Sequence, residues 1–258
     1  MKPEHYAELL RKAFENRTAI DPLRTEIGME DLNFAYAIQN INTQLRLDEG
    51  VRLVGKKIGL TSKAVQAQLG VDQPDFGMLF NDKEVLNGDR ISMKELMQPK
   101  VEAEIAFVLG EDLDGDGLTI IDLLASIDYA LPAIEIVGSR IKDWNIKITD
   151  TIADNASASH YVLGHTPRTL DEFDMIECSM KTIKNNQLVS EGKGAACLGS
   201  PLNAVLWLAN KMIEMGNPLQ AGELIFSGAL GPMANVEAND HVKIEIEGLG
   251  HVSVSFDE

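Results

Sequence analysis

The chain has few cysteines and few aromatic residues. Its two cysteines, Cys178 and Cys197, are not spaced as in a metal-binding motif, so we expect free thiols in a reducing cytoplasm. Aromatic residues make up only 5% of the 258 residues, while 45% are hydrophobic. Aliphatic side chains and the ten methionines must therefore fill most of a sizeable core.

Positive charge is also scarce. The formal net charge is −17 at pH 7, which argues against nucleic acid and anionic membrane surfaces as partners. This charge also disfavours an anionic substrate, unless a local cation reverses the field. A metal ion with lysines nearby would provide that reversal.

Several common signatures are missing. No apolar run is long enough to span a bilayer, and the first residues lack the apolar region of a signal peptide, so we expect a cytoplasmic protein. The sequence contains no dinucleotide-binding glycine fingerprint, phosphate-binding loop or nucleophile elbow. Motif-defined nucleotide binding and serine-hydrolase chemistry therefore find no support.

The first fifty residues have the periodicity of helices. Phe34, Ile38 and Ile41 recur at spacings of four and three, and an earlier stretch shows a similar stripe. After residue 50 the pattern changes to short strands and turns. We therefore predict a helical N-terminal segment over 1–50 and a β-rich domain over 51–258.

An acidic stretch, Glu111–Gly117, resembles the start of a calcium-binding loop. An EF-hand requires a bidentate glutamate at the twelfth loop position, which is Leu123 here, so we interpret the stretch as a solvated turn. Directly after it, Thr119 and Asp122 form a capping-box pattern. This pattern predicts a helix from there to about Ala130.

Later in the chain, helix and strand signals alternate irregularly. Ser200 and Pro201 are an N-cap and a first helical residue, which predicts a helix ending at Gly216. Two alternating apolar runs flank Gly248–Gly250 and predict a hairpin. Without a regular βαβ rhythm, the fold class predicted is α+β.

The run Val101–Leu109 has the pattern of a buried strand, but it contains Glu102 and Glu104. Because strand side chains alternate between faces, the two glutamates share the face opposite the apolar residues. Two carboxylates roughly 6–7 Å apart on a partly apolar face repel each other and lose hydration. A shifted pKa, a cationic partner or a metal ion relieves that cost.

A third glutamate, Glu135, lies in another short apolar run. Three such carboxylates suggest an all-oxygen site for Mg²⁺ or Mn²⁺. A solvated strand face explains the pair Glu102 and Glu104 equally well, and nothing in the spacing shows that Glu135 meets them. Both interpretations stay open from the residues alone.

Six segments in order carry a family resemblance: Gly55–Ser62, Gln73–Gly77, the strand with Glu102 and Glu104, Ile134–Arg140, Thr151–Ser157 and Ser227–Met233. Together they resemble the bacterial 2-oxopent-4-enoate (2-hydroxypenta-2,4-dienoate) hydratases of the fumarylacetoacetate hydrolase superfamily. The resemblance covers most of the chain, from about residue 50 to the end. Six ordered motifs are far more specific than any one of them.

The resemblance implies that Glu102, Glu104 and Glu135 bind the metal, Mg²⁺ or Mn²⁺. This agrees with the independent argument from the strand. It also implies a β-rich roll or barrel after the N-terminal helices, assembled as a homo-oligomer.

The resemblance implies two catalytic residues, Lys57 and Asp75, because they fall at a lysine position and an acidic position of the family. Without the family, a surface lysine beside Lys56 would be the better interpretation of Lys57. Asp75 falls at an acidic position that the sister 4-oxalocrotonate decarboxylases tend to lack, which favours a hydratase. We also predict that Asp154, Asn155 and Ser157 hydrogen-bond the substrate carboxylate or support the metal ligands. Ser227 and Gly228, in a Ser-Gly turn suited to close backbone approach to a ligand, complete the predicted substrate-binding residues.

The reaction implied is hydration of 2-hydroxypenta-2,4-dienoate to 4-hydroxy-2-oxopentanoate in aromatic meta-cleavage catabolism. Two alternatives on the same scaffold are a 4-oxalocrotonate decarboxylase and a hydratase of a longer 2-oxo-enoate dicarboxylate. A non-catalytic subunit that supports a partner enzyme is a more distant alternative. A complex with a pathway decarboxylase is a further expectation.

Overall fold

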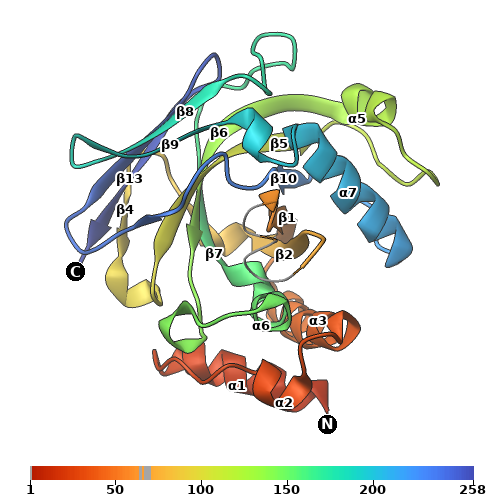
Figure 1. Ribbon diagram of the computed structural model, residues 1–258, viewed down its shortest axis with the longest axis vertical. Helices are drawn as coiled ribbons and strands as arrows, with labels where there is room; N and C mark the ends of the chain where they lie inside the picture. Colours follow the sequence, from red (N-terminus) through yellow and green to blue (C-terminus); the bar gives the residue numbers. More distant parts are fainter. Residues whose placement is uncertain (1, 64–65, 67–70) are drawn as a thin grey trace.

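The computed structural model describes residues 2–63, 66 and 71–258 (Figure 1). Within these residues the helices are α1 (Pro3–Glu15), α2 (Arg24–Ile27), α3 (Leu32–Asp48), α5 (Ile120–Ser126), α6 (Ile148–Ala153) and α7 (Pro201–Glu214). None of these helices has both the length and the apolar character needed to cross a membrane. The rest of the described chain is mainly strands and their connections.

Two sheets form the body of the molecule. The larger has the order β2 (Asp75–Phe80), β1 (Leu53–Gly59), β10 (Leu224–Phe226), β5 (Lys100–Leu109), β6 (Ile127–Val137), β7 (Ala158–Leu163) and β3 (Glu84–Val85), and β11 (Ala234–Asn235) also pairs with β5. The smaller has the order β4 (Arg90–Ser92), β13 (Gly250–Asp257), β12 (His241–Ile246), β8 (Ser179–Lys184) and β9 (Gln187–Lys193). The long, curved strands β5 and β6 run through the middle of this arrangement (Figure 1). The α+β prediction, with helices before a β-rich roll, is confirmed.

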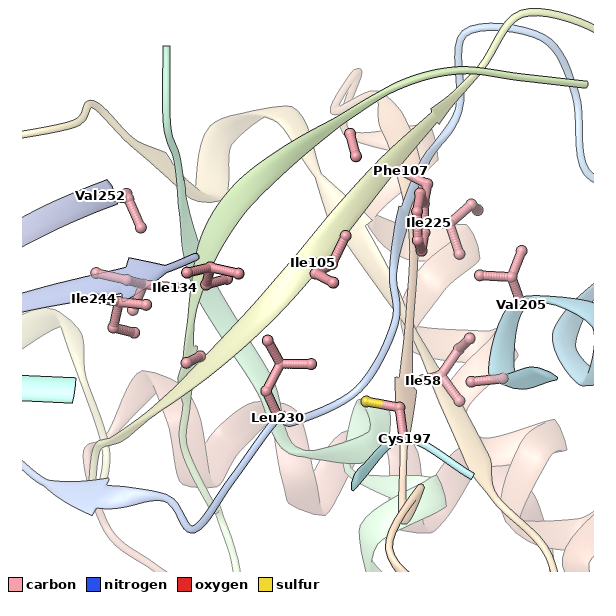
Figure 2. Close-up of a cluster of buried hydrophobic side chains, with 14 of the residues drawn as sticks. Ile58, Ile105, Phe107, Ile134, Cys197, Val205, Ile225, Leu230, Ile244 and Val252 are labelled. Carbon is pink, nitrogen blue, oxygen red and sulfur yellow. The ribbon is translucent and has the colours of Figure 1, made fainter. Parts of the chain in front are cut away.

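The main core lies between the two sheets and extends to α7. Figure 2 shows residues of β5, β6, β10 and α7 together with residues of the smaller sheet: Ile105, Phe107, Ile134, Ile225, Val205, Ile244 and Val252. The alternate residues of β5 that we predicted to share an apolar face are all buried: Val101, Ala103, Ile105, Phe107 and Leu109. Burying this face fixes the direction in which the glutamates of β5 point, because a one-residue slip would exchange the two faces.

The N-terminal helices build a second core. Tyr6 of α1 and Ile38 of α3 are buried together with Ile148 and Ile152 of α6, which belongs to a later part of the chain. Gln39 of α3 donates hydrogen bonds to the carbonyl oxygens of Phe76 (2.9 Å) and Ile152 (3.0 Å). The helical segment therefore braces both β2 and α6. The division at residue 50 stays a prediction.

The local predictions outside the site are mostly confirmed. The Ser200 side chain accepts a hydrogen bond from the Leu202 backbone N–H at the start of α7. Strands β12 and β13 form the expected antiparallel hairpin. The capping box is also present, since the Asp122 carboxylate accepts from the Thr119 N–H at 2.7 Å.

The predicted extent of the helix after Thr119 was wrong. The helix α5 ends at Ser126, and β6 begins at Ile127 instead of after Ala130. The reason is tertiary: from Ile127 the chain pairs with β5 along its length, and Ile127, Ala130 and Ile134 of this apolar run are buried in the sheet. Ile121 of the short helix is already 77% exposed.

Candidate metal centre and active site

The pairing of β5 with β6 brings the three glutamates together. Glu102 lies directly opposite Glu135 in the antiparallel register, and Glu104 follows two residues along β5 on the same face. One carboxylate oxygen from each of the three lies within 4.8 Å of the others. The sequence could not show that Glu135 joins the pair, and the structure answers that question.

Two of these carboxylates are buried and the third, Glu102, is half-buried. Glu104 and Glu135 are fully buried, and Oε1 of each has no hydrogen-bond partner among the described residues. Burial, together with the charge of Glu135, raises the pKa of Glu102 to about 7 and raises the pKa of Glu104 well above its ordinary value. Such orphaned anionic oxygens fit a hard divalent cation, which would supply the missing positive charge. The residues present therefore fit a hard divalent cation.

One oxygen of the cluster is held by the backbone. Glu104 Oε2 accepts a hydrogen bond from the N–H of Gly228 at 2.7 Å. Gly228 has φ +98°, and a Cβ at this position would lie 2.3 Å from Thr61 Oγ1, so only glycine allows this approach. The neighbouring Ser227 hydroxyl is fully buried and donates to the Gly228 carbonyl at 3.1 Å. The structure thus places Ser227 and Gly228 against the acidic cluster.

Lys57 reaches the same cluster from β1. Its Nζ lies 3.2 Å from Glu135 Oε2 and donates to the Ala156 carbonyl at 3.0 Å. Burial by itself lowers the pKa of Lys57, but the charges of Glu135 and Glu102 raise it above its ordinary value, so the side chain stays charged. Lys56 points the other way and pairs with Glu223 at 2.7 Å. Neither lysine is on the surface, so the alternative of a surface lysine is wrong.

Asp75 lies on β2 in register with Gly59 of β1. Its side chain packs so closely over Gly59 that a Cβ there would lie 2.1 Å from Asp75 Oδ1. Burial raises the pKa of Asp75 to about 6, although the nearby charge of Lys57 opposes the rise. A carboxyl group with this pKa can exchange a proton near neutral pH.

The segment after α6 carries the other predicted substrate residues, and its side chains are largely engaged within the protein. The Asp154 carboxylate accepts from the Arg140 backbone N–H at 2.8 Å and from the Arg140 guanidinium. The Asn155 side chain accepts from the Met78 N–H at 2.8 Å and donates to the Met78 carbonyl at 3.0 Å. The Ser157 hydroxyl lies 3.3 Å from that of Thr151. Their assignment to substrate binding stays a prediction.

Sequence reasoning missed several contributors to the site. The Ala156 carbonyl and the packing at Gly59 and Thr61 leave no residue-type signal, because they depend on backbone position. Arg140 lies in one of the six family segments, but we assigned it no role. A buried arginine is rarely left without an acidic partner, so its proximity to Asp154 could have been expected.

Comparison with known proteins gives a consistent result. Residues 49–256 match the family model described as fumarylacetoacetate (FAA) hydrolase C-terminal. The chain is 56% identical to the TodF product hydratase of Pseudomonas putida, over 97% of this chain and 93% of the relative. It is 52% identical to 2-keto-4-pentenoate hydratase 1 of Dechloromonas aromatica, over 99% of this chain and 97% of the relative.

A solved structure supports the same grouping. The 4-oxalocrotonate decarboxylase from Pseudomonas putida G7, complexed with magnesium and adipate, superposes with a TM-score of 0.94 at 32% identity, over 99% of this chain and 98% of that chain. A fold of two curled sheets with a buried acidic trio, matched over most of its length, defines a fumarylacetoacetate hydrolase class of protein. The chain belongs to this family, as its six sequence segments led us to expect.

Proposed function

We propose that this protein is a metal-dependent hydratase that adds water to 2-hydroxypenta-2,4-dienoate (2-oxopent-4-enoate) and forms 4-hydroxy-2-oxopentanoate. The main support is the identity of 52–56% to two hydratases along nearly the whole chain. The geometry agrees with this proposal, because an acidic trio, a charged lysine and an aspartate of raised pKa meet in one buried site. The proposed pathway is aromatic meta-cleavage catabolism.

We assign Glu102, Glu104 and Glu135 as the ligands of Mg²⁺ or Mn²⁺. A metal held there would supply Lewis acidity to the 2-oxo acid end of the substrate. The solved relative was studied with magnesium, which supports this choice for the present chain. The choice between the two ions belongs to this proposal.

Lys57 carries the electrostatic part of the proposed reaction. The dienol first ketonises: the 2-hydroxyl proton leaves and a proton is added at C5, which gives 2-oxopent-3-enoate. Water then adds at C4 and a proton is added at C3. Negative charge grows on the 2-oxygen during this addition, and we assign its stabilisation to the buried ammonium of Lys57.

Asp75 is the proposed general base. Since its pKa is raised to about 6, a large share of the group is ionised at pH 7 and can accept a proton from the attacking water. Asp154, Asn155, Ser157, Ser227 and Gly228 complete the proposed substrate site, by direct contact or by support of the groups that touch the substrate.

A decarboxylase of 4-oxalocrotonate is the second candidate, because the superposition with such an enzyme is close over the whole chain. The lower identity of 32%, against 52–56% for the hydratases, places it second. A hydratase of a longer dicarboxylate remains an alternative on the same scaffold. Homo-oligomeric assembly, a complex with a pathway decarboxylase and a cytoplasmic location stay predictions.

The deciding experiment follows the ultraviolet absorbance of freshly generated 2-hydroxypenta-2,4-dienoate mixed with the purified protein. Parallel reactions contain Mg²⁺, Mn²⁺ or excess chelator, and mass spectrometry identifies the product. Metal-dependent loss of the dienol with a gain of one water supports the hydratase. Release of carbon dioxide from 4-oxalocrotonate supports the decarboxylase, and no change with either substrate contradicts both.

A further inference from the structure

Three consecutive residues beside the acidic cluster have left-handed backbone. Asn155, Ala156 and Ser157 have φ of 56°, 49° and 59°, and none of them is glycine. Each such residue costs free energy, because its Cβ is crowded by the backbone. A run of three persists only where the surrounding structure determines it, and such strain gathers at functional sites. We refer to Asn155–Ser157 as the left-handed turn.

Polar contacts hold this turn at both ends. The Asn155 side chain makes two hydrogen bonds to the Met78 backbone of β2, at 2.8 and 3.0 Å. The carbonyl of Ser157 accepts from the Gly138 N–H at 2.9 Å. Just before the turn, Arg140 donates to the carbonyl of Asp154 at 2.6 Å. The turn is therefore fixed by tethers to β2 and to the segment after β6.

The turn packs closely against β2 and also borders a cavity. A Cβ on Gly77 would lie 2.3 Å from the Asn155 carbonyl oxygen, so β2 supports the turn from very near. Asp154, Asn155 and Ala158 also line a cavity of about 180 Å³, which residues of β2, α1 and α3 complete. Because Asn155 borders this cavity, its position depends on the two side-chain hydrogen bonds to Met78 as well as on packing.

The held conformation has one consequence for the site. It directs the Ala156 carbonyl at Lys57 Nζ, 3.0 Å away, and that nitrogen also lies 3.2 Å from Glu135. We infer that the left-handed turn is a positioning element that fixes the Lys57 ammonium beside the acidic cluster, with Asn155 as its main tether. This inference rests on the proposed function for its kinetic part and refines the role given to Asn155. In this account Asn155 acts through Lys57 and makes no substrate contact.

A second asparagine in the same chain provides a matched control. Asn185, at the turn between β8 and β9, has φ 51° and a side chain that makes two hydrogen bonds, with Asp240 (2.7 Å) and His241 (2.9 Å). It is exposed and belongs to the smaller sheet. Replacing it removes comparable contacts without touching the site. A general loss of stability would appear in both variants, whereas a loss of lysine positioning would appear in one.

The kinetic test compares Asn155→Ala with Asn185→Ala under saturating Mg²⁺. We expect Asn155→Ala to lower kcat for 2-hydroxypenta-2,4-dienoate about 10-fold or more, with KM and Mg²⁺ affinity within about threefold of wild type. Asn185→Ala should retain its kcat. If Asn155→Ala does not fold, Asn155→Gly tests the same point, because glycine tolerates the left-handed backbone and lacks the tether.

A double-mutant cycle with Lys57→Met tests whether Asn155 affects the rate through Lys57. If the turn acts through Lys57, Asn155→Ala should lower the residual rate of the Lys57→Met protein by less than about twofold. A full additional 10-fold loss in that background would overturn the inference, and so would a raised KM with unchanged kcat. The second pattern would instead show a substrate contact.

Crystal structures of the wild type and of Asn155→Ala or Asn155→Gly give a readout that needs no activity. We expect Lys57 Nζ to leave the Ala156 carbonyl and Glu135 in the variants, while the three glutamates keep their places. Should Lys57 stay within hydrogen-bond distance of both, the inference is wrong. If the wild type does not hydrate the dienol, the proposed function fails, and the displacement of Lys57 still tests the inference.

Discussion

Two acidic regions of this chain lie close together in sequence and differ in their exposure to solvent and in the distances between their carboxylates. The stretch Glu111–Gly117 concentrates four carboxylates in seven residues, and all four are exposed in a turn. The trio Glu102, Glu104 and Glu135 is sparser in sequence, yet its oxygens converge within 4.8 Å at the centre of a sheet. Within the described chain, only the trio has the geometry of a metal site.

The difference shows that burial, and not the density of acidic residues, makes the site. Water screens and solvates the carboxylates of the turn, so they need no other partner. In the trio, Glu104 and Glu135 have lost that water and Glu102 is half-buried, and burial together with the charge of Glu135 raises the pKa of Glu102 and Glu104. A bound cation would neutralise the repelling negative charges of the trio. In the turn, where water already solvates the carboxylates, the same cation would gain little binding free energy.

The strongest test of this comparison exchanges one carboxylate for an amide in each region. Glu102→Gln should lower both the Mg²⁺ affinity and the hydratase rate by about 100-fold to 1000-fold, since a Lewis acid contributes several kcal/mol to such a reaction. Asp114→Asn, in the exposed turn, should leave both within about twofold. Calorimetric Mg²⁺ titration and the dienol absorbance assay measure the two effects. Wild-type metal affinity in Glu102→Gln would break the comparison.

The next largest effect concerns the cation that already faces the trio. Lys57→Met should lower kcat by about 100-fold, as does the loss of one donor to a developing oxyanion. Its Mg²⁺ affinity should be equal or higher, because a competing positive charge is gone. Lys56→Met is the control: it breaks the pair with Glu223 and should lower stability with little effect on kcat. Equal kcat losses in the two variants would contradict the assignment.

Asp75→Asn separates stability from activity through pH. The folded-state pKa of Asp75 is about 6, above the ordinary value of 3.8, so the folded protein binds more protons between these values and loses stability as pH rises through them. At pH 7 the free energy of unfolding of Asp75→Asn should therefore be about 1–3 kcal/mol higher than that of the wild type. This gain in stability should vanish below about pH 4. Urea titrations at several pH values measure this.

The same variant should lose about 10-fold to 100-fold in turnover if Asp75 is the general base. Unchanged turnover at pH 7 would remove Asp75 from the mechanism. A variant that is less stable at pH 7 than wild type would show that the carboxylate is better solvated than its burial implies.

A change at the start of α7 gives the smallest effect. Ser200→Ala removes the side chain that caps α7 and should lower the free energy of unfolding by about 1 kcal/mol, or roughly 2–4 °C in Tm. Metal affinity and kcat should not change. Thermal denaturation together with the dienol assay tests this, and a clear kcat loss would mean that helix stability couples to the site.

Much of the fold was predictable because its signals are local. The alternation in Val101–Leu109, the cap at Ser200 and the hairpin around Gly248–Gly250 depend on residues a few positions apart. The end of the helix after Thr119 was not predictable in this way. There the apolar sequence suits a helix or a strand, and pairing with β5 decided between them.

In the candidate site, too, some features were predictable from the sequence and others depended on tertiary contacts. Sequence alone showed two glutamates on one strand face and suggested Glu135 as a third, and the family resemblance added Lys57 and Asp75. Neither could show that Lys57 is held by the carbonyl of Ala156, because a backbone oxygen carries no residue signature. Nor could they show that the Asn155 side chain is occupied by the backbone of β2.

The sequence by itself determined the apolar face of Val101–Leu109, the helix start at Ser200, the hairpin around Gly248–Gly250, and the family to which the chain belongs. The tertiary structure alone decided that Glu102 stands opposite Glu135 and that a strained turn meets Lys57. The physical reason is the sequence separation of the residues that interact. Periodicity and capping are set by neighbours along the chain, whereas strand register and the burial of charge depend on contacts between distant segments, which form only when the whole core closes.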